Sequence, residues 1–315
     1  MAKPYITTKI RYKSEEWYEA HKKGLGGSDA AAICRMSQYA SPLTVYFDKL
    51  GLSPEREENE AMKQGSELEE YGARRFVEKT GKKVRIQPFM LQSKKYPFML
   101  ADVDRFVVGE DAILEIKTTL NRDGYTFEGN DYPATYMVQA LHYMAVTGAK
   151  KAYIAVLVFG RDFKIIPIER NETVEKDIQA LIQLEKQFWE ENVAKEIPPI
   201  PTGIENDSKF LSTAYQANEE LQTVDLTPLD KQLEEIIALK AQKSLLESEI
   251  AKRENSVKTT LAEATRGETE RYKVTWKEST SNKFDSTAFK RDNPEVYNQY
   301  CKLTTSRRFL LSEKK

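Results

Sequence analysis

Four ionisable side chains in two neighbouring segments have the types and the spacing for metal-dependent chemistry. They are Asp102, Asp104, Glu115 and Lys117, and they lie in two strand-like runs separated by only residues 109–111. Residues two apart in a strand point to one face, so Glu115 and Lys117 share a face. The two aspartates also share one if their run stays extended. Because the connection is short enough for a hairpin, the two ionisable faces can coincide.

A divalent cation would explain why these charges gather on adjacent strands, because it removes the cost of burying carboxylates together. Asp104 and Glu115 would ligate Mg²⁺, with Mn²⁺ as a substitute, since hard cations prefer oxygen ligands. Lys117 would lie beside the attacking water. This Asp…Glu-x-Lys arrangement suits phosphodiester hydrolysis, in which the metal polarises the phosphoryl oxygen and lowers the pKa of the water. Glu-x-Lys alone is weak, since a solvated strand edge produces it by chance.

A third acid, Glu69, lies on the wrong side of a predicted helix for an ordinary surface residue. In the helix expected over 61–80, Glu69 aligns with Gly72 and Phe76 on the apolar face. One interpretation is an ion pair or a frayed amphipathic boundary. The other is a further metal ligand.

The helix expected over 133–147 presents Tyr136, Gln139 and Tyr143 on one face, at positions i, i+3 and i+7. Gln139 could hydrogen-bond a phosphate or position Lys117. Taken alone, a glutamine here is more often a surface residue and the tyrosines are more often core residues.

Histidine and cysteine are too scarce for several other chemistries. The chain has only His21, His142, Cys34 and Cys301, in 315 residues. Their spacing lacks the short ligand pairs of a zinc module, and no motif supports a catalytic triad. We interpret His142 as structural. Enzymatic chemistry here should therefore depend on Asp, Glu and Lys.

The remaining pattern predicts an α/β fold around a central mixed sheet flanked by helices, with a C-terminal helical and short-strand (α+β) extension. We expect a first domain at 1–200, a linker at 201–225 that follows a proline-rich stretch, and a second domain at 226–315. In the second domain, apolar residues spaced by threes and fours indicate a long helix or helical hairpin of about 35 residues, shorter than a sustained coiled coil would need. Strands are expected at 271–277 and 307–311.

Charge and hydropathy place the chain in a broad class. Lys and Arg number 48 and Asp and Glu 49, which gives a net charge of −1. Residues 226–315 hold 18 basic and 14 acidic residues, so the first part is the more acidic. No apolar run is long enough for a membrane span, and the N-terminus lacks the apolar stretch of a signal peptide. Together with the scarce cysteines, this predicts a cytoplasmic protein with no membrane partner.

Five motifs in this order resemble the YqaJ-type phage recombination nucleases, in the lambda-exonuclease-like branch of the PD-(D/E)xK nuclease superfamily. The resemblance covers about Trp17 to Arg170. Its motifs are GLGGSDAA from Gly24, GSELE from Gly65, ADVDR from Ala101, EIK from Glu115 and QALHY from Gln139. It implies a PD-(D/E)xK nuclease core.

The resemblance implies roles for the matching residues. Asp104 and Glu115 would be the metal-binding acids, with the Ile116 carbonyl as a further ligand. Lys117 would be the catalytic lysine, Glu69 the helical acid near the metals and Gln139 a downstream catalytic residue. Ser28 would help to hold a 5′-phosphate, near Lys22 and Lys23, which occupy a place where relatives often carry arginine. Gln139 and Tyr143 would also face DNA, and the role of Asp102 stays open.

The function that follows is a Mg²⁺-dependent deoxyribonuclease that resects linear double-stranded DNA 5′→3′ for a phage single-strand annealing protein. By resemblance, the chain would be a homo-oligomer, a trimer. Two alternatives are an endonuclease or branch-structure nuclease with the same site, and a catalytically inactive DNA-binding protein of this fold.

Overall fold

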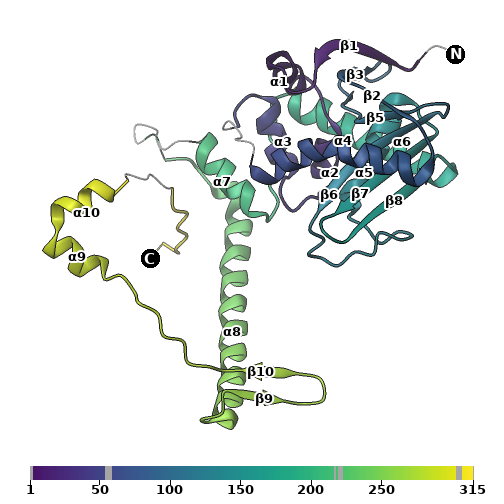
Figure 1. Ribbon diagram of the computed structural model, residues 1–315. Helices are drawn as coiled ribbons and strands as arrows, with labels where there is room; N and C mark the ends of the chain where they lie inside the picture. Colours follow the sequence, from purple (N-terminus) through teal and green to yellow (C-terminus); the bar gives the residue numbers. More distant parts are fainter. Residues whose placement is uncertain (1–2, 54–58, 216–217, 219–222, 303–306, 315) are drawn as a thin grey trace. The chain divides into compact units, whose positions relative to one another are not determined.

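The computed structural model describes residues 3–53, 59–215, 218, 223–302 and 307–314 (Figure 1). The chain divides into two compact units, Met1–Gln216 and Ala217–Lys315. All of the residues expected to carry chemistry lie in the first unit.

The first unit is built on a five-stranded sheet with the strand order β2-β5-β6-β7-β8. The strands are β2 (Val84–Ile86), β5 (Arg105–Val107), β6 (Ala112–Thr119), β7 (Lys151–Val158) and β8 (Asp162–Glu169). The β6–β7 pair is parallel and the other pairs are antiparallel. The sheet is therefore mixed, as the sequence predicts, and the 105–119 hairpin is confirmed.

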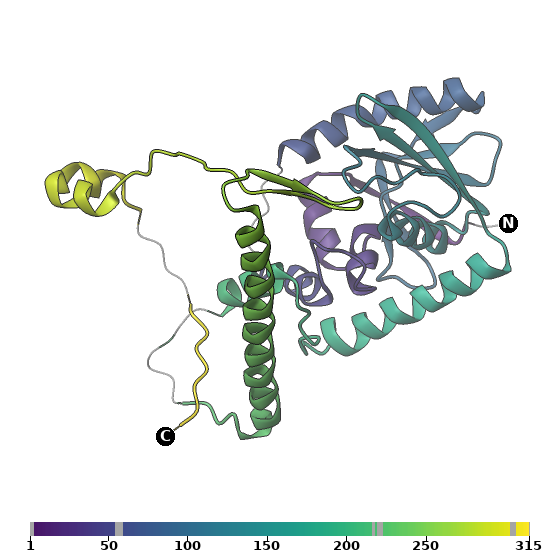
Figure 2. The same ribbon diagram turned by 90° about the horizontal axis from the view of Figure 1, so that it is seen from below.

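Helices cover both faces of this sheet (Figure 2). Helix α4 (Glu60–Thr80) packs on β6 and β7 from one side, and the opposite side is covered by α5 (Ala134–Thr147), which in turn packs on α6 (Glu172–Phe188). The end signals of α4 are local: the Asn59 side chain accepts from the Met62 amide, and Gly81 adopts the left-handed conformation that ends the helix. The expected α/β class is thus confirmed.

A second, three-stranded sheet joins β1 (Tyr5–Arg11), β3 (Phe89–Ser93) and β4 (Leu100–Ala101). No strand is expected at β1 from the sequence pattern. Short helices α1 (Glu15–Lys22), α2 (Gly27–Ile33) and α3 (Pro42–Lys49) follow it. The last of these begins with Ser41 as N-cap and Pro42 in the first turn, the position that proline favours.

The run that contains Asp102 and Asp104 is not one strand. Strand β4 pairs with β3 in the small sheet, whereas β5 pairs with β2 and β6 in the large sheet. The chain therefore leaves one sheet and enters the other at residues 102–104, which are not in a strand. The condition under which the two aspartates would share a strand face, an extended run, is therefore not met.

The first unit extends beyond the expected boundary at residue 200. After α6, a π-helical turn at Trp189–Val193 leads to α7 (Glu205–Ala214), which contacts α3. Buried Asp207 fastens α7, because it accepts hydrogen bonds from Ser41 Oγ and from Thr202 Oγ1. The segment expected as a linker therefore contains a packed helix, and residues 216–217 and 219–222 of that segment lie outside the described residues.

The second unit begins with a 3₁₀ turn (Thr227–Leu229) and one long helix, α8 (Asp230–Leu261). A hairpin of β9 (Arg266–Glu268) and β10 (Lys273–Thr275) follows, and then α9 (Ser286–Asp292) and α10 (Pro294–Tyr300). Of the two expectations for this region, the single helix is confirmed. The strand expected at 307–311 is wrong: residues 307–314 have no regular structure, since no neighbouring strand pairs with their backbone.

None of the described helices combines the length and the apolar character needed to cross a membrane.

Candidate active site

Strand β6 and helix α5 bring Glu115, Lys117 and Gln139 into one hydrogen-bonded group. Lys117 Nζ donates to Glu115 Oε1 over 2.8 Å and to Gln139 Oε1 over 2.7 Å. Gln139 Nε2 donates to the same oxygen of Glu115 over 2.8 Å. The period of two along β6 and the parallel β6–α5–β7 crossover explain this meeting, because the crossover helix lies over the face that both β6 side chains share.

Helix α5 is itself held close to this group by small residues and by Tyr143. A Cβ atom on Gly27 of α2 would lie 2.6 Å from Tyr143 Cε1 and 2.8 Å from Gln139 Cγ, so only glycine permits this approach. The buried Tyr143 hydroxyl accepts from Gln139 Nε2 over 3.1 Å. Tyr143 therefore supports Gln139 from behind. Tyr136 borders Lys117, with the ammonium 5.6 Å from the centre of the ring.

Asp104 also belongs to this group. It lies at the end of the segment 102–104, where the chain passes from the small sheet to the large sheet. Its Oδ2 accepts a hydrogen bond from the Ile116 amide over 2.7 Å. Burial, followed by repulsion from Glu115 and then from Glu69, raises the pKa of Asp104 well above its ordinary value. Within a strand, the N–H and C=O of one residue point toward the same neighbouring strand. The Ile116 carbonyl therefore points in the same direction as the Ile116 amide, toward the segment that carries Asp104.

Glu69 approaches the same place from α4. The helix can lie close to β6 because a Cβ on Gly72 would be 2.6 Å from Ile116 Cγ2. Glu69 is half-buried on the core side of α4, as predicted, and burial raises its pKa while Arg105 opposes the shift. Arg105 pairs directly with Glu70, at 2.9 Å, rather than with Glu69. The nearby guanidinium thus only partly offsets the negative charge.

Asp102 lies at the border of the group. Burial raises its pKa to about 6, and repulsion from Glu115 adds to this shift. Among the described residues, neither Asp102 Oδ1 nor the buried Trp17 Nε1 has a hydrogen-bond partner. Glu115 Oε2 is likewise buried without a partner. Such orphaned oxygens are costly in a folded protein unless something else binds them.

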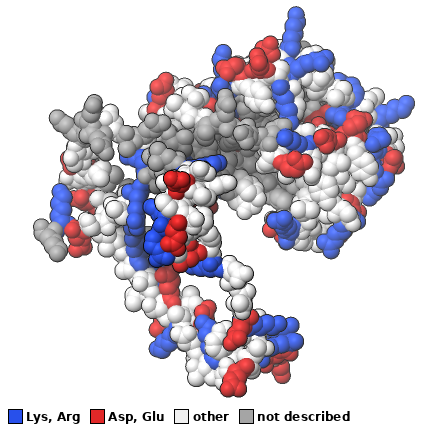
Figure 3. Space-filling model, turned by 60° about the vertical axis from the view of Figure 1, so that its left-hand side comes forward, with Lys and Arg blue, Asp and Glu red and all other residues white. Residues whose placement is uncertain are grey.

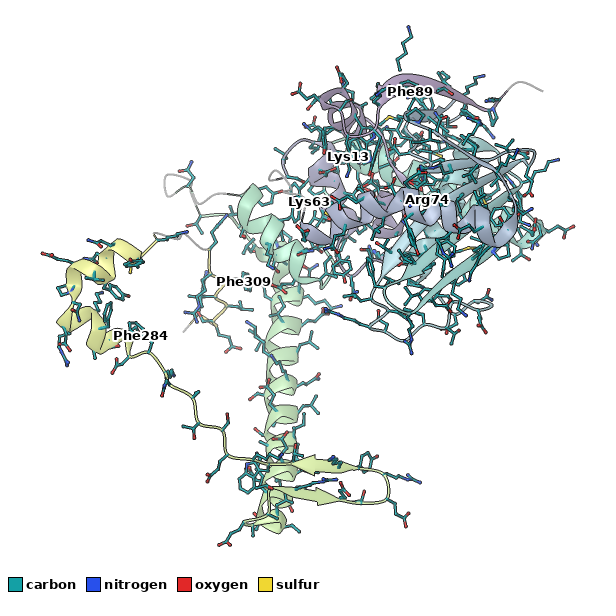
Figure 4. All side chains as sticks on the ribbon, in the orientation of Figure 1. Lys13, Lys63, Arg74, Phe89, Phe284 and Phe309 are labelled. Carbon is teal, nitrogen blue, oxygen red and sulfur yellow. The ribbon has the colours of Figure 1, made fainter. Side chains whose placement is uncertain are left out.

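Two aromatic residues at this site are not predicted from the sequence. Tyr12 and Trp17 pack edge to face, with ring centres 5.2 Å apart. Burial and then the charges of Glu69, Asp102, Asp104 and Glu115 raise the pKa of Tyr12, so its hydroxyl stays protonated. The loop after β1 brings them here; its Lys13, labelled in Figure 4 beside α4, donates to Ser66 Oγ over 2.8 Å. With β1 unpredicted, only an aromatic pair near the glycine turn could have hinted at them.

Of the candidate phosphate-binding residues, Ser28 has a different environment from Lys22 and Lys23. Ser28 is exposed at the start of α2, directly after Gly27. The turn before it is fixed by buried Asp29, which accepts from the Gly26 amide and pairs with Lys49 at 2.7 Å.

The two lysines have acidic neighbours instead. Lys22 pairs with Glu19 at 2.6 Å, and Lys23 lines a surface hollow together with Glu15, Glu16 and Glu19. These carboxylates oppose an anion at either lysine.

His142 does not join the active-site group. It is fully buried and its ring bonds Glu185 Oε1 over 2.8 Å and the Leu100 carbonyl over 2.7 Å. The structural interpretation from the sequence is confirmed.

The donor set at β6 fits a hard divalent cation. Among the described residues, no three His, Cys, Asp or Glu side chains already form a closed metal cluster. The acids nevertheless have the properties of ligands that need a cation: an orphaned Glu115 oxygen, and an Asp104 carboxyl whose ionisation is opposed by its neighbours. Oxygen donors of this kind suit Mg²⁺ or Mn²⁺.

Comparisons with solved structures return, among others, three structures of two exonucleases, each with a TM-score below 0.5. The alkaline exonuclease of Laribacter hongkongensis is 22% identical with a TM-score of 0.42, and covers 58% of this chain and 100% of its own. Its complex with dAMP is 21% identical with a TM-score of 0.43, at the same coverage. A phage-related exonuclease from Haemophilus somnus is 17% identical with a TM-score of 0.38, and covers 61% of this chain and 97% of its own. No conclusion about this chain depends on them.

Sequence comparison is more decisive. A profile of the YqaJ-like viral recombinase domain matches residues 16–150, which include every residue of the candidate site except Tyr12 and Lys13. The protein YqaJ of Bacillus subtilis strain 168 is 35% identical over 303 residues, which cover 95% of this chain and 94% of that protein. This chain therefore belongs to the YqaJ-like viral recombinase family.

Proposed function

We propose that this protein is a Mg²⁺-dependent exodeoxyribonuclease that resects linear double-stranded DNA 5′→3′ during phage recombination, with Mn²⁺ as a substitute cofactor. One observation carries the proposal: Asp104, Glu115, Lys117 and Gln139 converge at β6, with a carboxylate oxygen for which the described part of the chain supplies no hydrogen-bond partner. Membership of the YqaJ-like viral recombinase family agrees with it.

Asp104, Glu115 and the Ile116 carbonyl would hold the cation, with Glu69 next to them. When bound, the cation would polarise the phosphoryl oxygen and lower the pKa of the attacking water. The chain's own contribution is rigidity. Asp104 is fixed by the backbone of β6, and Glu115 is fixed by Lys117 and Gln139.

Lys117 acts as a charged donor rather than as a base. Burial disfavours its ammonium, but attraction and a hydrogen bond to Glu115, together with attraction to Asp104, outweigh burial and raise the pKa of Lys117. An ammonium has three donors, and two of them are directed at Glu115 and Gln139. The third can orient the attacking water or donate to a phosphate oxygen.

Ser28 is the strongest candidate for the 5′-phosphate contact. It is exposed beside Gly27, which itself packs on Gln139, so a terminal phosphate there would be near the cleaved bond. Lys22 and Lys23 would have to leave their glutamate neighbours to help. Tyr143 would act through Gln139 rather than on DNA.

The decisive experiment digests end-labelled linear duplex, with and without a 5′-phosphate, in Mg²⁺, Mn²⁺ or EDTA. Lys117→Ala should reduce cleavage by more than about 100-fold, as expected for loss of a positioned proton donor. Glu115→Ala should abolish it, and circular dichroism should show that both variants stay folded. Unchanged cleavage by both variants would overturn the assignment.

The same assay separates the alternatives. Cleavage of closed circular duplex would indicate an endonuclease, and preference for forked substrates would indicate a branch-structure nuclease. DNA binding without cleavage in either metal would indicate an inactive DNA-binding protein. Release of label from the 5′ end would support the proposed polarity, and Ser28→Ala should reduce the preference for phosphorylated ends.

We propose, by resemblance, that the nuclease unit assembles as a trimer and works with a single-strand annealing protein. Native mass spectrometry of residues 1–216, the first compact unit, would test the trimer.

A further inference from the structure

Helix α8 is long, and its apolar residues are not covered within the second unit. It has 32 residues, none of which is buried. Leu239, Leu246, Ile250 and Val257 have exposed fractions of 63%, 65%, 57% and 44%. In Figure 3, Lys and Arg alternate with Asp and Glu along this helix, with uncharged surface between them. A helix of this kind normally gains its stability by packing an apolar stripe on a partner.

The apolar positions follow a heptad repeat. If Ile236 occupies position a, the a positions are Leu229, Ile236, Lys243, Ile250 and Val257, and the d positions are Gln232, Leu239, Leu246, Arg253 and Thr260. Six of these ten residues are apolar, with Ile or Val favoured at a and Leu at d. This pattern is typical of two-stranded coiled coils. The 32 residues of α8 span more than the roughly three to four heptads that a coiled coil needs, so the expectation from the sequence that the helix is too short for one is wrong.

We propose that α8 of two copies of this chain packs as an antiparallel two-stranded coiled coil, centred on the layer of Lys243 and Leu246. The proposal does not depend on the nuclease assignment, because it concerns assembly through the second unit alone.

The two cations in the stripe decide the orientation. An in-register parallel pair would place Lys243 against Lys243 of the second copy and Arg253 against Arg253, and a parallel trimer would bring three of each together. In the antiparallel pair, a positions face d positions, so Lys243 faces Leu246 and Arg253 faces Ile236. Each cation then meets an apolar residue, over which its aliphatic stem can lie.

Two glutamates on the same helix form ion pairs with the Lys243 ammonium and the Arg253 guanidinium. Lys243 Nζ is 3.5 Å from Glu247, and Arg253 is 2.5 Å from Glu249. These glutamates occupy the e and g positions that border the stripe. The charged ends can therefore turn outward while the stems remain in the interface.

Charges that flank the stripe favour the same orientation. In the antiparallel pair, e positions face e positions, so Lys240 meets Glu247 of the second copy, and the two-fold symmetry makes this pair twice. Gln242 meets Glu249, and no like charges meet. In the parallel pair, Glu235 meets Lys240 but Glu249 meets Glu254, so attraction is offset by repulsion.

The test measures the native mass of the full chain across a concentration series, with one matched pair of variants. Leu246 lies in the stripe, whereas its neighbour Leu245 lies outside it with a similar exposed fraction of 69%. Leu246→Lys should halve the native mass, and Leu245→Lys should leave it unchanged. The native mass should halve whether the wild type is a dimer or a larger assembly in which nuclease trimers are joined through α8.

Leu246→Ala keeps helix propensity, so it tests the interface even if the lysine variant loses helix. It should raise the dissociation constant at least about tenfold, the equivalent of 1.4 kcal/mol. A monomeric or strictly trimeric wild type would overturn the proposal, and so would equal effects of the two lysine variants. In those cases the stripe is covered by another part of the same chain, such as the tail around Phe309, whose ring lies 5.8 Å from Lys240 Nζ.

Orientation is tested by exchange of charges. Lys240→Glu should weaken the dimer, because the introduced carboxylate would face Glu247 of the second copy. Adding Glu247→Lys should restore it in an antiparallel pair. Failure of the double variant to restore association would overturn the antiparallel arrangement, since in a parallel pair the introduced carboxylate faces Glu235 and stays repelled.

Discussion

The Ile116 amide donates to Asp104 Oδ2 over 2.7 Å, so the backbone of one strand fixes the acid that precedes the neighbouring strand. This contact holds Asp104 in place even though residues 102–104 are not in a strand. The acid is therefore positioned for ligation while Glu115 and Glu69 oppose its ionisation. A bound cation would reduce the repulsion between Asp104 and these two glutamates.

Asp104→Asn should separate position from charge, because the amide oxygen can still accept from Ile116. We expect the cleavage rate to fall by more than about 100-fold. Removing a residue that only hydrogen-bonds to a metal ligand already lowers metal affinity or activity by about 10–100-fold, and Asp104 would be a ligand itself. The melting temperature of the metal-free protein should stay the same or rise. Mg²⁺ should raise the melting temperature of the wild type but not of the variant, which a thermal scan with and without EDTA would show. Equal Mg²⁺ stabilisation of both proteins would contradict the role of Asp104.

Gln139→Leu should disturb the position of Lys117 and Glu115 without removing either. We expect cleavage to fall by about 10–100-fold at saturating DNA, because Gln139 bonds both residues. Tyr143→Phe is the matched control: it removes only the hydroxyl behind Gln139 and should cost less than Gln139→Leu. A larger loss from the tyrosine variant would mean that Tyr143 itself contacts the substrate.

Asp102→Asn should stabilise the metal-free protein above about pH 6. The carboxyl has a pKa of about 6 in the folded protein, mainly through burial, against about 3.9 in an unfolded chain. The folded state therefore binds more protons between these values, and its stability falls as pH rises through them. The variant should gain up to about 3 kcal/mol at pH 8, at 1.36 kcal/mol for each pKa unit, and nothing below about pH 4. Urea unfolding in EDTA across this range is the measurement, and a pH-independent difference would contradict the prediction.

The buried pair of His142 and Glu185 should stabilise the folded protein in acid and lose this effect as the pH rises. Burial disfavours the imidazolium, but attraction and a hydrogen bond to Glu185, together with the hydrogen bond to the Leu100 carbonyl, outweigh burial and raise the pKa of His142 above its ordinary value. The pair's contribution is therefore complete below about pH 6.5 and is lost as pH rises through the folded pKa. His142→Gln should cost roughly 3 kcal/mol in acid and progressively less in alkali. Glu185→Gln should remove the same pH dependence in chemical denaturation, and a constant cost across pH would refute the assignment.

The local sequence pattern determines much of the candidate site. The alternation along 112–118 places Glu115 and Lys117 on one face, and the helical spacing predicts that Glu69 faces the core and that Gln139 shares a face with Tyr143. These predictions succeed because they depend on the periods of a single strand or helix, which are set by neighbours in the chain.

Tertiary structure decides what depends on distant partners. Asp102 and Asp104 lie between two strands rather than within one, because β4 and β5 pair with strands of different sheets. Tyr12 and Trp17 reach the acids because β1 pairs with β3, a strand far away in the sequence. The first unit continues past residue 200 because Asp207 bonds Ser41, 166 residues earlier. No local periodicity encodes such pairings, since their free energy comes from burying surfaces that meet only in the folded chain.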